Sequence, residues 1–284
     1  MIRKKKMFWK QILIFNRPAF ISSALLITLC IFLLLFFGDM QKFYKIILGL
    51  IIFGAFYFSI VSILFSYFIY DRSDLYKFNW LKPYLKDDGN LFNVYSGYSE
   101  GGHILNKIFV QKRMTHFDFF DHSVSVTGSI QKAQSVSEPI KNIPVIFNDW
   151  KVQDKATTIL FMQSLHELRK KEQKIECLNE AACHLSPGGK LIVTEHLCDI
   201  KNFLIYGPGA FHFFGKRHWK GVFKNASLKV SGEFNITPFV KIYILSEWQI
   251  FQHILSRSGS YLLCSLLFIS SSLKDFNGRR SFLK

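Results

Sequence analysis

Leu185-Ser186-Pro187-Gly188-Gly189-Lys190-Leu191-Ile192-Val193-Thr194-Glu195-His196 is the stretch that decides the fold. A helical pattern stops at Leu185, a tight Pro-Gly-Gly turn follows, and an apolar run then ends in an acid and a histidine. Short apolar runs bounded by proline and glycine are typical of buried strands. The stretch therefore predicts a helix-to-strand junction that presents polar side chains at the carboxyl end of a strand, where α/β sheets bind ligands.

Other short apolar runs surround this junction. They predict strands over 91–95, 115–120, 144–147, 157–162 and 190–195, and residues 171–185 form a helical pattern with one apolar face. Strands that alternate with helices indicate a doubly wound, mainly parallel sheet. Residues 228–234 and 239–245 flank a Thr-Pro turn and predict a terminal antiparallel pair.

The N-terminal part has a different composition. Residues 18–38 are uncharged over 21 positions and residues 46–70 over 25, each enough to cross a hydrocarbon core of about 30 Å. A cleaved signal peptide or a buried core helix are the alternatives for the first span. A signal peptide has an apolar region of only about 7 to 15 residues, and here a longer second span follows after seven residues. We therefore expect a transmembrane helical hairpin.

Charge sets the expected orientation and partners. Six basic residues precede the first span (Arg3, Lys4, Lys5, Lys6, Lys10 and Arg17), and such clusters remain on the cytoplasmic side. The short connection between the spans returns the chain to the same side, so the remainder is expected to be cytoplasmic. The net charge of +16 is spread along the chain without a nucleic-acid-binding motif. Apposition to anionic membrane lipid explains this charge, and no nucleic-acid partner is expected.

These patterns divide the chain into five segments. They are a basic cytoplasmic N-terminus (1–17), the transmembrane hairpin (18–70), a juxtamembrane connector (71–89), an α/β domain (90–247) and a C-terminal tail (248–284). Trp80 and Tyr84 in the connector suit the lipid headgroup level, so the connector is expected against the membrane. The apolar part of the tail, residues 261–269, is too short to span and predicts an interfacial segment or a disordered end.

The ends of the first three predicted strands carry candidate cofactor-binding residues. Gly97 lies in a glycine-bearing turn after the first strand, where backbone amides can approach a nucleotide-like ligand. Asp118, and as second choice Asp121, follows the second strand, where an acid can accept hydrogen bonds from ribose hydroxyls. Asn148 or Asp149 follows the third strand and can bind an adenine edge. Ordinary turn and solvated-acid roles are the alternatives, and the neighbouring Trp150 is either a stacking surface or a core anchor.

Three histidines are candidate catalytic residues. His166, beside Glu167, follows the fourth predicted strand, and His196 ends the fifth. His212 belongs to Gly207–Phe214, an aromatic segment that suits a lid, an acceptor-pocket wall or packing against lipid. A hydrogen-bonded structural histidine is the alternative in each case. Glu195, His196, Asp199, His212 and His218 form no metal-ligand spacing, and the five cysteines are odd in number and scattered, so neither a metal site nor a disulfide framework is expected.

In their order, these features resemble the class I S-adenosylmethionine-dependent methyltransferases over about residues 88–247. The resemblance rests on the glycine turn at Gly97, the acid Asp118, Asn148-Asp149, His166-Glu167 and the Leu-Ser-Pro-Gly-Gly-Lys junction. The continuation from Glu195 to Leu204 resembles a membrane-associated bacterial subgroup. The resemblance implies a Rossmann-like sheet and S-adenosylmethionine as cofactor. At the cofactor loop the chain departs from the family, with Asn93 at the acid's position, Tyr95 and Ser99 at glycine positions, and Glu100 as a substitute contact for the methionine amino group.

The sequence thus predicts a membrane-anchored methyltransferase that acts on a small apolar or lipid-like acceptor. Methyl transfer from a sulfonium depends chiefly on alignment of the nucleophile and the methyl group. A general base is needed only where the acceptor loses a proton, and His166, His196 and His212 are the candidates in that order. The alternative is a noncatalytic membrane scaffold with a degenerate methyltransferase fold, and a nucleic-acid methyltransferase is a third hypothesis.

Overall fold

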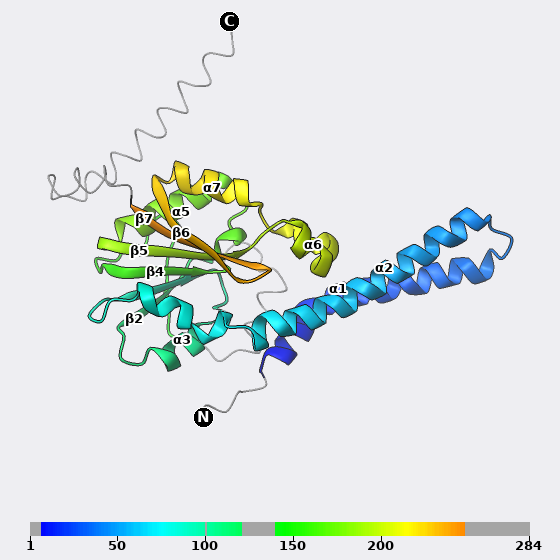
Figure 1. Cartoon of the computed structure of the whole chain (residues 1–284), viewed down its shortest axis with the longest axis horizontal. Coiled ribbons are helices and arrows are strands. Elements are labelled where there is room, and N and C mark those ends of the chain that lie inside the picture. The colour runs from blue at the N-terminus through cyan, green and yellow to red at the C-terminus, as the bar shows by residue number, and fades with distance from the viewer. Residues whose placement is uncertain (1–6, 100, 121–139, 248–284) are drawn as a thin grey trace, which may run out of the picture.

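A computed structural model describes residues 7–99, 101–120 and 140–247 of the chain. Figure 1 shows two parts: a pair of long helices that lie side by side, and an α/β body from which the pair projects. The predicted tail (248–284) and Asp121 lie outside the described residues.

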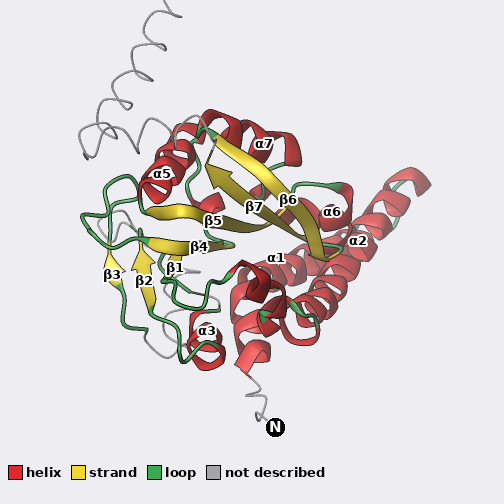
Figure 2. Cartoon of the chain, turned by 60° about the vertical axis from the view of Figure 1, so that its left-hand side comes forward, coloured by secondary structure: helices red, strands yellow, loops and turns green. Residues whose placement is uncertain are grey.

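A seven-stranded sheet forms the centre of the body, in the order β3-β2-β1-β4-β5-β7-β6 (Figure 2). Neighbouring strands from β3 to β5 pair in parallel, whereas β7 pairs antiparallel with both β5 and β6. The mainly parallel sheet and the terminal antiparallel pair are therefore confirmed. The strands are β1 (Leu91–Tyr95), β2 (Met114–Asp118), β3 (Ile143–Pro144), β4 (Ala156–Met162), β5 (Leu185–His196), β6 (Leu228–Thr237) and β7 (Val240–Glu247).

The Pro-Gly-Gly segment lies inside β5 and not in a turn before it, which corrects the sequence prediction. Ala156 of β4 is aligned with Leu185, but two residues later Thr158 is aligned with Lys190, so β5 accommodates three extra residues as a bulge. Gly188 adopts φ +72°, and a Cβ on Gly189 would lie 2.8 Å from the Ser186 carbonyl oxygen. The bulge requires glycine at both positions because one needs a left-handed backbone and the other a bare Cα.

Two helices cover one face of the sheet, α5 (Lys171–Cys183) and α7 (Lys216–Asn225). Their apolar faces pack on side chains of β1, β4, β5 and β7 in one hydrophobic core. Helix α5 ends two residues before the predicted end at Leu185, because that residue already pairs with β4.

The opposite face is covered by α3 (Gly102–Ile108), α6 (Ile200–Tyr206) and the connector. Short helical turns continue from the end of α2 into the connector, over Phe68–Arg72, Leu75–Lys77 and Asn79–Tyr84. Leu75, Phe78 and Leu81 are completely buried in the second core, and Tyr84 packs against it. The expectation that this segment lies flat against a membrane is therefore wrong for most of its apolar side chains, which pack on the sheet.

The helix pair consists of α1 (Met7–Phe36) and α2 (Lys42–Tyr67). Both have the length and composition of membrane spans, with mean hydropathy 2.7 and 2.5 in their most apolar windows and only 6% of each window buried. Leu35, Phe36, Leu50 and Phe53 are each more than 60% exposed. Because apolar surface of this extent is unfavourable in water, the pair must be covered by lipid or by protein.

Candidate functional site

A cavity of about 740 Å³ lies where the base of the helix pair meets the carboxyl edge of the sheet. The α/β body contributes a polar wall formed by Gln163, His166, His196 and His212. Aromatic side chains form much of the remaining lining: Phe20, Phe58, Tyr70, Tyr76, Tyr98, Tyr206 and Phe213. The predicted role of Gly207–Phe214 as a pocket wall agrees with this geometry, since Pro208, Gly209, His212 and Phe213 all line the cavity.

The helix pair contributes serine hydroxyl groups to the same cavity. All five serines of α1 and α2 line it: Ser22, Ser23, Ser59, Ser62 and Ser66. The three in α2 are spaced i, i+3 and i+7, which places them on one helix face. The apolar composition of these helices predicted an anchor only, although the serine spacing in α2 was a readable signal of a further role.

His166 and Glu195 form a buried pair at the polar wall. His166 Nδ1 lies 2.7 Å from Glu195 Oε2, and the His166 backbone amide donates to Glu195 Oε1 at 3.3 Å. Glu195 is fully buried, so its carboxylate fixes the imidazole with Nε2 directed away from it. Burial by itself lowers the pKa of His166, but the carboxylates of Glu195 and Glu167 outweigh burial and raise this pKa to about 10.

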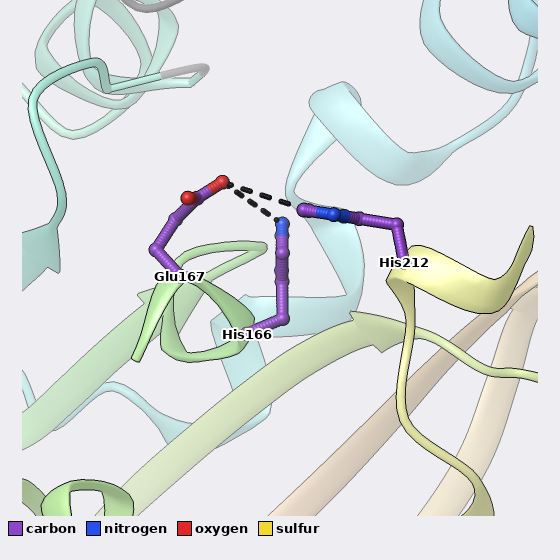
Figure 3. A group of neighbouring side chains, drawn as sticks. All are labelled: His166, Glu167 and His212. Carbon is purple, nitrogen blue, oxygen red and sulfur yellow. Dashed lines mark ion pairs between the residues drawn. The ribbon is translucent and has the colours of Figure 1, made fainter. Parts of the chain in front are cut away.

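Glu167 and His212 lie on the other side of the His166 ring, as Figure 3 shows. Glu167 Oε1 is 3.3 Å from His166 Nε2 and 4.0 Å from His212 Nε2. The His166 hydrogen bond is the main cause that lowers the pKa of Glu167. Arg169 ties the two segments together, because its Nη1 donates to the carbonyl oxygens of His166 and His212 at 3.2 and 2.8 Å.

His196 has a different environment from the other two histidines. Its Nδ1 lies 3.2 Å from Asn202 Oδ1 and 3.1 Å from the Phe239 carbonyl oxygen, so this nitrogen carries the proton. Its Nε2 lies 3.2 Å from the Tyr70 hydroxyl. Burial lowers the pKa of His196 to about 4. We conclude that His196 is neutral and holds Tyr70 at the cavity.

Gln163 follows β4 and has two unusual properties. Its backbone adopts φ +51°, a conformation that is costly for a residue with a side chain. Its Oε1 lies 3.3 Å from the Tyr70 hydroxyl, but its buried Nε2 has no hydrogen-bond partner among the described residues. A buried unpaired donor at a cavity wall is a polar group to which a ligand can bind. Gln163 was not among the residues predicted from the sequence.

A hydrogen bond joins the turn after β1 to the end of β2. Gly97 has φ +69°, and its amide donates to Asp118 Oδ1 at 2.7 Å. The Phe120 amide donates to the same oxygen at 3.0 Å, and Asn142 Nδ2 lies 3.4 Å from Oδ2. Asp118 thus lies at the carboxyl edge of the sheet, but its carboxylate also organises the turn.

Asn93 and Tyr95 take part in side-chain contacts that the family's acid and glycine would not make. Asn93 Nδ2 donates to Ser99 Oγ at 2.9 Å and lies 3.0 Å from His116 Nδ1. The buried Tyr95 accepts a hydrogen bond at its hydroxyl from Asn142 Nδ2 at 2.8 Å. The phenol therefore lies beside Asp118, and Asn142 contacts both.

The residues after β3 lie apart from the cavity lining. Asn148 Nδ2 donates to Glu176 of α5 at 3.0 Å, and Asp149 lies 3.6 Å from the Lys151 ammonium. Trp150 is a core anchor, 2% exposed and stacked between Phe117 and His184. An adenine contact by Asn148 or Asp149 stays a prediction, and the predicted contact by Glu100 lies outside the described residues.

Comparisons with known proteins support the fold only. No protein-family model and no curated protein matches the sequence. The pyocyanin biosynthetic protein PhzM matches with a TM-score of 0.53 at 10% identity, over 87% of this chain and 74% of that chain. An S-adenosylmethionine-dependent methyltransferase from Aquifex aeolicus matches with 0.45 at 15% identity, over 61% of this chain and 89% of that one. One from Clostridium acetobutylicum matches with 0.44 at 10% identity, over 61% and 89%. The chain is thus structurally similar to the Rossmann-like class I methyltransferases.

Proposed function

We propose that this protein is a membrane-anchored S-adenosylmethionine-dependent methyltransferase that acts on a small apolar or lipid-like acceptor. The observation that carries the proposal is the shared cavity, where the apolar helix pair and the ligand-binding edge of a methyltransferase-like sheet meet. A molecule that enters along the helices arrives directly at the polar wall. The helices are then part of the acceptor site as well as an anchor.

The cofactor side offers groups that suit S-adenosylmethionine. Asp118 supplies a carboxylate for ribose hydroxyls, which are hydrogen-bond donors. The unpaired Nε2 of Gln163 supplies a donor for the methionine carboxylate, and Tyr98 lines the same cavity from the turn after β1. When bound, the cofactor supplies an electrophilic methyl group. The Tyr95–Asn142 contact beside Asp118 is the feature that favours the alternative, a degenerate fold that has lost cofactor binding.

The acceptor side is matched to an amphiphilic molecule. Phe20 and Phe58 suit a hydrocarbon portion, the serines of α1 and α2 suit a few hydroxyl or carbonyl groups, and His166 and His212 suit the reacting heteroatom. Glu195 holds the His166 ring in one orientation, and the aromatic lining excludes water. Alignment of the two reactants in such a site supplies a large part of the rate enhancement of methyl transfer.

Calorimetric titration of the detergent-solubilised chain with S-adenosylmethionine tests the proposal. We expect micromolar to submillimolar binding of one cofactor per chain. Gln163→Met should weaken it at least tenfold, because a hydrogen bond to a charged group contributes about 1.5–3 kcal/mol. Gln153→Met, at an exposed position, should leave it unchanged. No binding at millimolar cofactor would support the noncatalytic scaffold instead.

A second measurement tests the acceptor class. Radiolabelled methyl transfer should occur to a component of the organic phase when the chain is incubated with extracted membrane lipids. Transfer only to RNA or DNA, with a steep dependence on salt, would support the nucleic-acid methyltransferase hypothesis.

A further inference from the structure

His166, Glu167 and His212 form a cluster of three potential metal ligands at the cavity. One ligand atom from each lies within 4.8 Å of the other two. In Figure 3 both imidazole rings point toward the same carboxylate oxygen of Glu167. The first two residues come from the turn after β4 and the third from the segment after α6, so the fold brings together residues 45 positions apart.

The distances in this cluster are close to those that a metal ion requires. Zinc bonds nitrogen and carboxylate oxygen at about 2.0–2.2 Å, so two ligands of a tetrahedral ion lie about 3.4 Å apart. The His166 Nε2 to Glu167 Oε1 distance is 3.3 Å, and the His212 Nε2 to Glu167 Oε1 distance is 4.0 Å. The His212 side chain is 51% exposed, so it can close the remaining gap without disturbing the core.

The surroundings support the same role. A metal-ligating histidine ordinarily donates its second ring N–H to a carboxylate or carbonyl, and Glu195 lies 2.7 Å from His166 Nδ1. This contact leaves Nε2 as the nitrogen that faces the cluster. Arg169 adds a second support, since its hydrogen bonds to the carbonyls of His166 and His212 hold the two ligand-bearing segments together.

We propose that His166 Nε2, the Glu167 carboxylate and His212 Nε2 bind one divalent transition-metal ion, with Zn²⁺ as the ion that this set fits. Two imidazoles and one carboxylate leave a further coordination position, and His166 and His212 line the cavity toward which it opens. That position would bind an oxygen atom of the acceptor. The part that concerns the acceptor rests on the proposed function, whereas ion binding does not.

Ion binding is tested on the tag-free full chain in detergent, stripped with a chelator and titrated with ZnCl₂ by calorimetry. We expect one ion per chain with submicromolar affinity. His212→Ala and Glu167→Gln should each weaken binding more than a hundredfold, and Glu195→Gln about 10- to 100-fold, the usual loss when a supporting carboxylate is removed. His103→Ala in α3 is the matched control and should bind as the wild type does. Co²⁺ bound in place of Zn²⁺ should give visible absorption bands that His212→Ala abolishes.

Two results would overturn the proposal. One is the absence of Zn²⁺ binding up to 1 mM, which would mean that the cluster is a hydrogen-bonded ion-pair network only. The other is binding that the His212→Ala and Glu167→Gln chains retain in full. Since His212 is half-exposed, its alanine variant should fold. A circular dichroism spectrum equal to that of the wild type is the check. S-adenosylmethionine titration of the stripped chain is a separate readout, so failure of the metal site and failure of the proposed function are distinguishable.

Discussion

At the scale of single residues, the close packing around Gly189 in the β5 bulge predicts that a side chain there destabilises the fold. A Cβ on Gly189 would lie 2.8 Å from the Ser186 carbonyl oxygen and 3.1 Å from that of Thr157, both backbone atoms. We expect Gly189→Ala to lower the free energy of unfolding by about 1–3 kcal/mol, as overpacking commonly does. Thermal unfolding in detergent measures this loss. Gly209→Ala is the control, because its new Cβ has an ordinary contact 3.9 Å from Tyr206; equal melting temperatures for both variants would contradict the assignment.

A second prediction at this scale concerns His116. Its Nδ1 accepts from Asn93 and its Nε2 donates to Asn106, so the neutral ring is fully paired. Burial, with a smaller contribution from His103, lowers the pKa of His116 to about 4, against about 6.5 in the unfolded chain. Between these values the unfolded state binds more protons, so stability falls as the pH drops from about 6.5 toward 4.

The loss due to His116 should be on the order of 2 kcal/mol at pH 5. His116→Gln should therefore show a smaller decrease in melting temperature between pH 7 and pH 5 than the wild type. Between pH 7 and pH 8 His116 is mostly neutral in both states, so the two chains should change nearly equally, both with the loss of stability that the raised pKa of His166 causes. An unchanged acid sensitivity in the variant would assign the effect to other groups, of which buried His196 is the first candidate.

Single residues also show where sequence reasoning reached its limit at the site. His166 follows β4 and His196 ends β5, and both line the cavity at the carboxyl edge of the sheet. Their partners were not predictable, because the Glu195 contact joins residues 29 positions apart, one in the turn after β4 and one on the neighbouring strand β5, and depends on how the two strands are aligned. The proximity of His212 to Glu167 was not predictable either, because these residues are 45 positions apart in the sequence. The unpaired Gln163 donor depends on a left-handed backbone that its residue type does not indicate.

At the scale of elements, hydrophobic pattern predicted most strands well. It predicted the third strand poorly, since only Pro144 of the expected 144–147 belongs to β3, and it also predicted the connector poorly. Residues 91–95 form β1 as predicted, because a short apolar run between turn residues has few other solutions. The connector was assigned to the membrane interface because its Trp and Tyr suit that environment as well as they suit a protein core. A buried sheet face and a lipid surface both select aromatic side chains, and composition alone does not separate them.

The serine stripe of α2 leads to an element-scale prediction. Ser62 is 9% exposed and lines the cavity, so Ser62→Leu should fill part of it. We expect at least tenfold weaker binding of a dansyl-labelled fatty acid, measured by fluorescence, with S-adenosylmethionine affinity changed less than twofold. Gly54→Leu is the matched control on the same helix, because a Cβ there meets no atom within 4 Å. Equal fatty-acid binding by both variants would mean that the cavity does not receive the acceptor.

At the scale of the whole molecule, the question is what covers the exposed helix pair. A second copy of the chain that buries the helices is the alternative to lipid. Two observations favour lipid: large apolar side chains are exposed along most of both helices, and the serines of both helices all line the cavity. A protein interface would ordinarily add a polar rim to each helix.

Topology labelling separates these two states. In a chain whose natural cysteines are replaced by alanine, Asp39→Cys places a thiol in the short connection between α1 and α2, and Asp88→Cys places one at the start of the α/β body. If the helices span a membrane with both ends cytoplasmic, a membrane-impermeant maleimide should label the first thiol in intact cells and the second only after permeabilisation. The basic cluster before α1 is the reason to expect this orientation. Labelling of neither thiol in intact cells, together with recovery of the chain as a dimer after membranes are removed, would show that a second copy covers the helices.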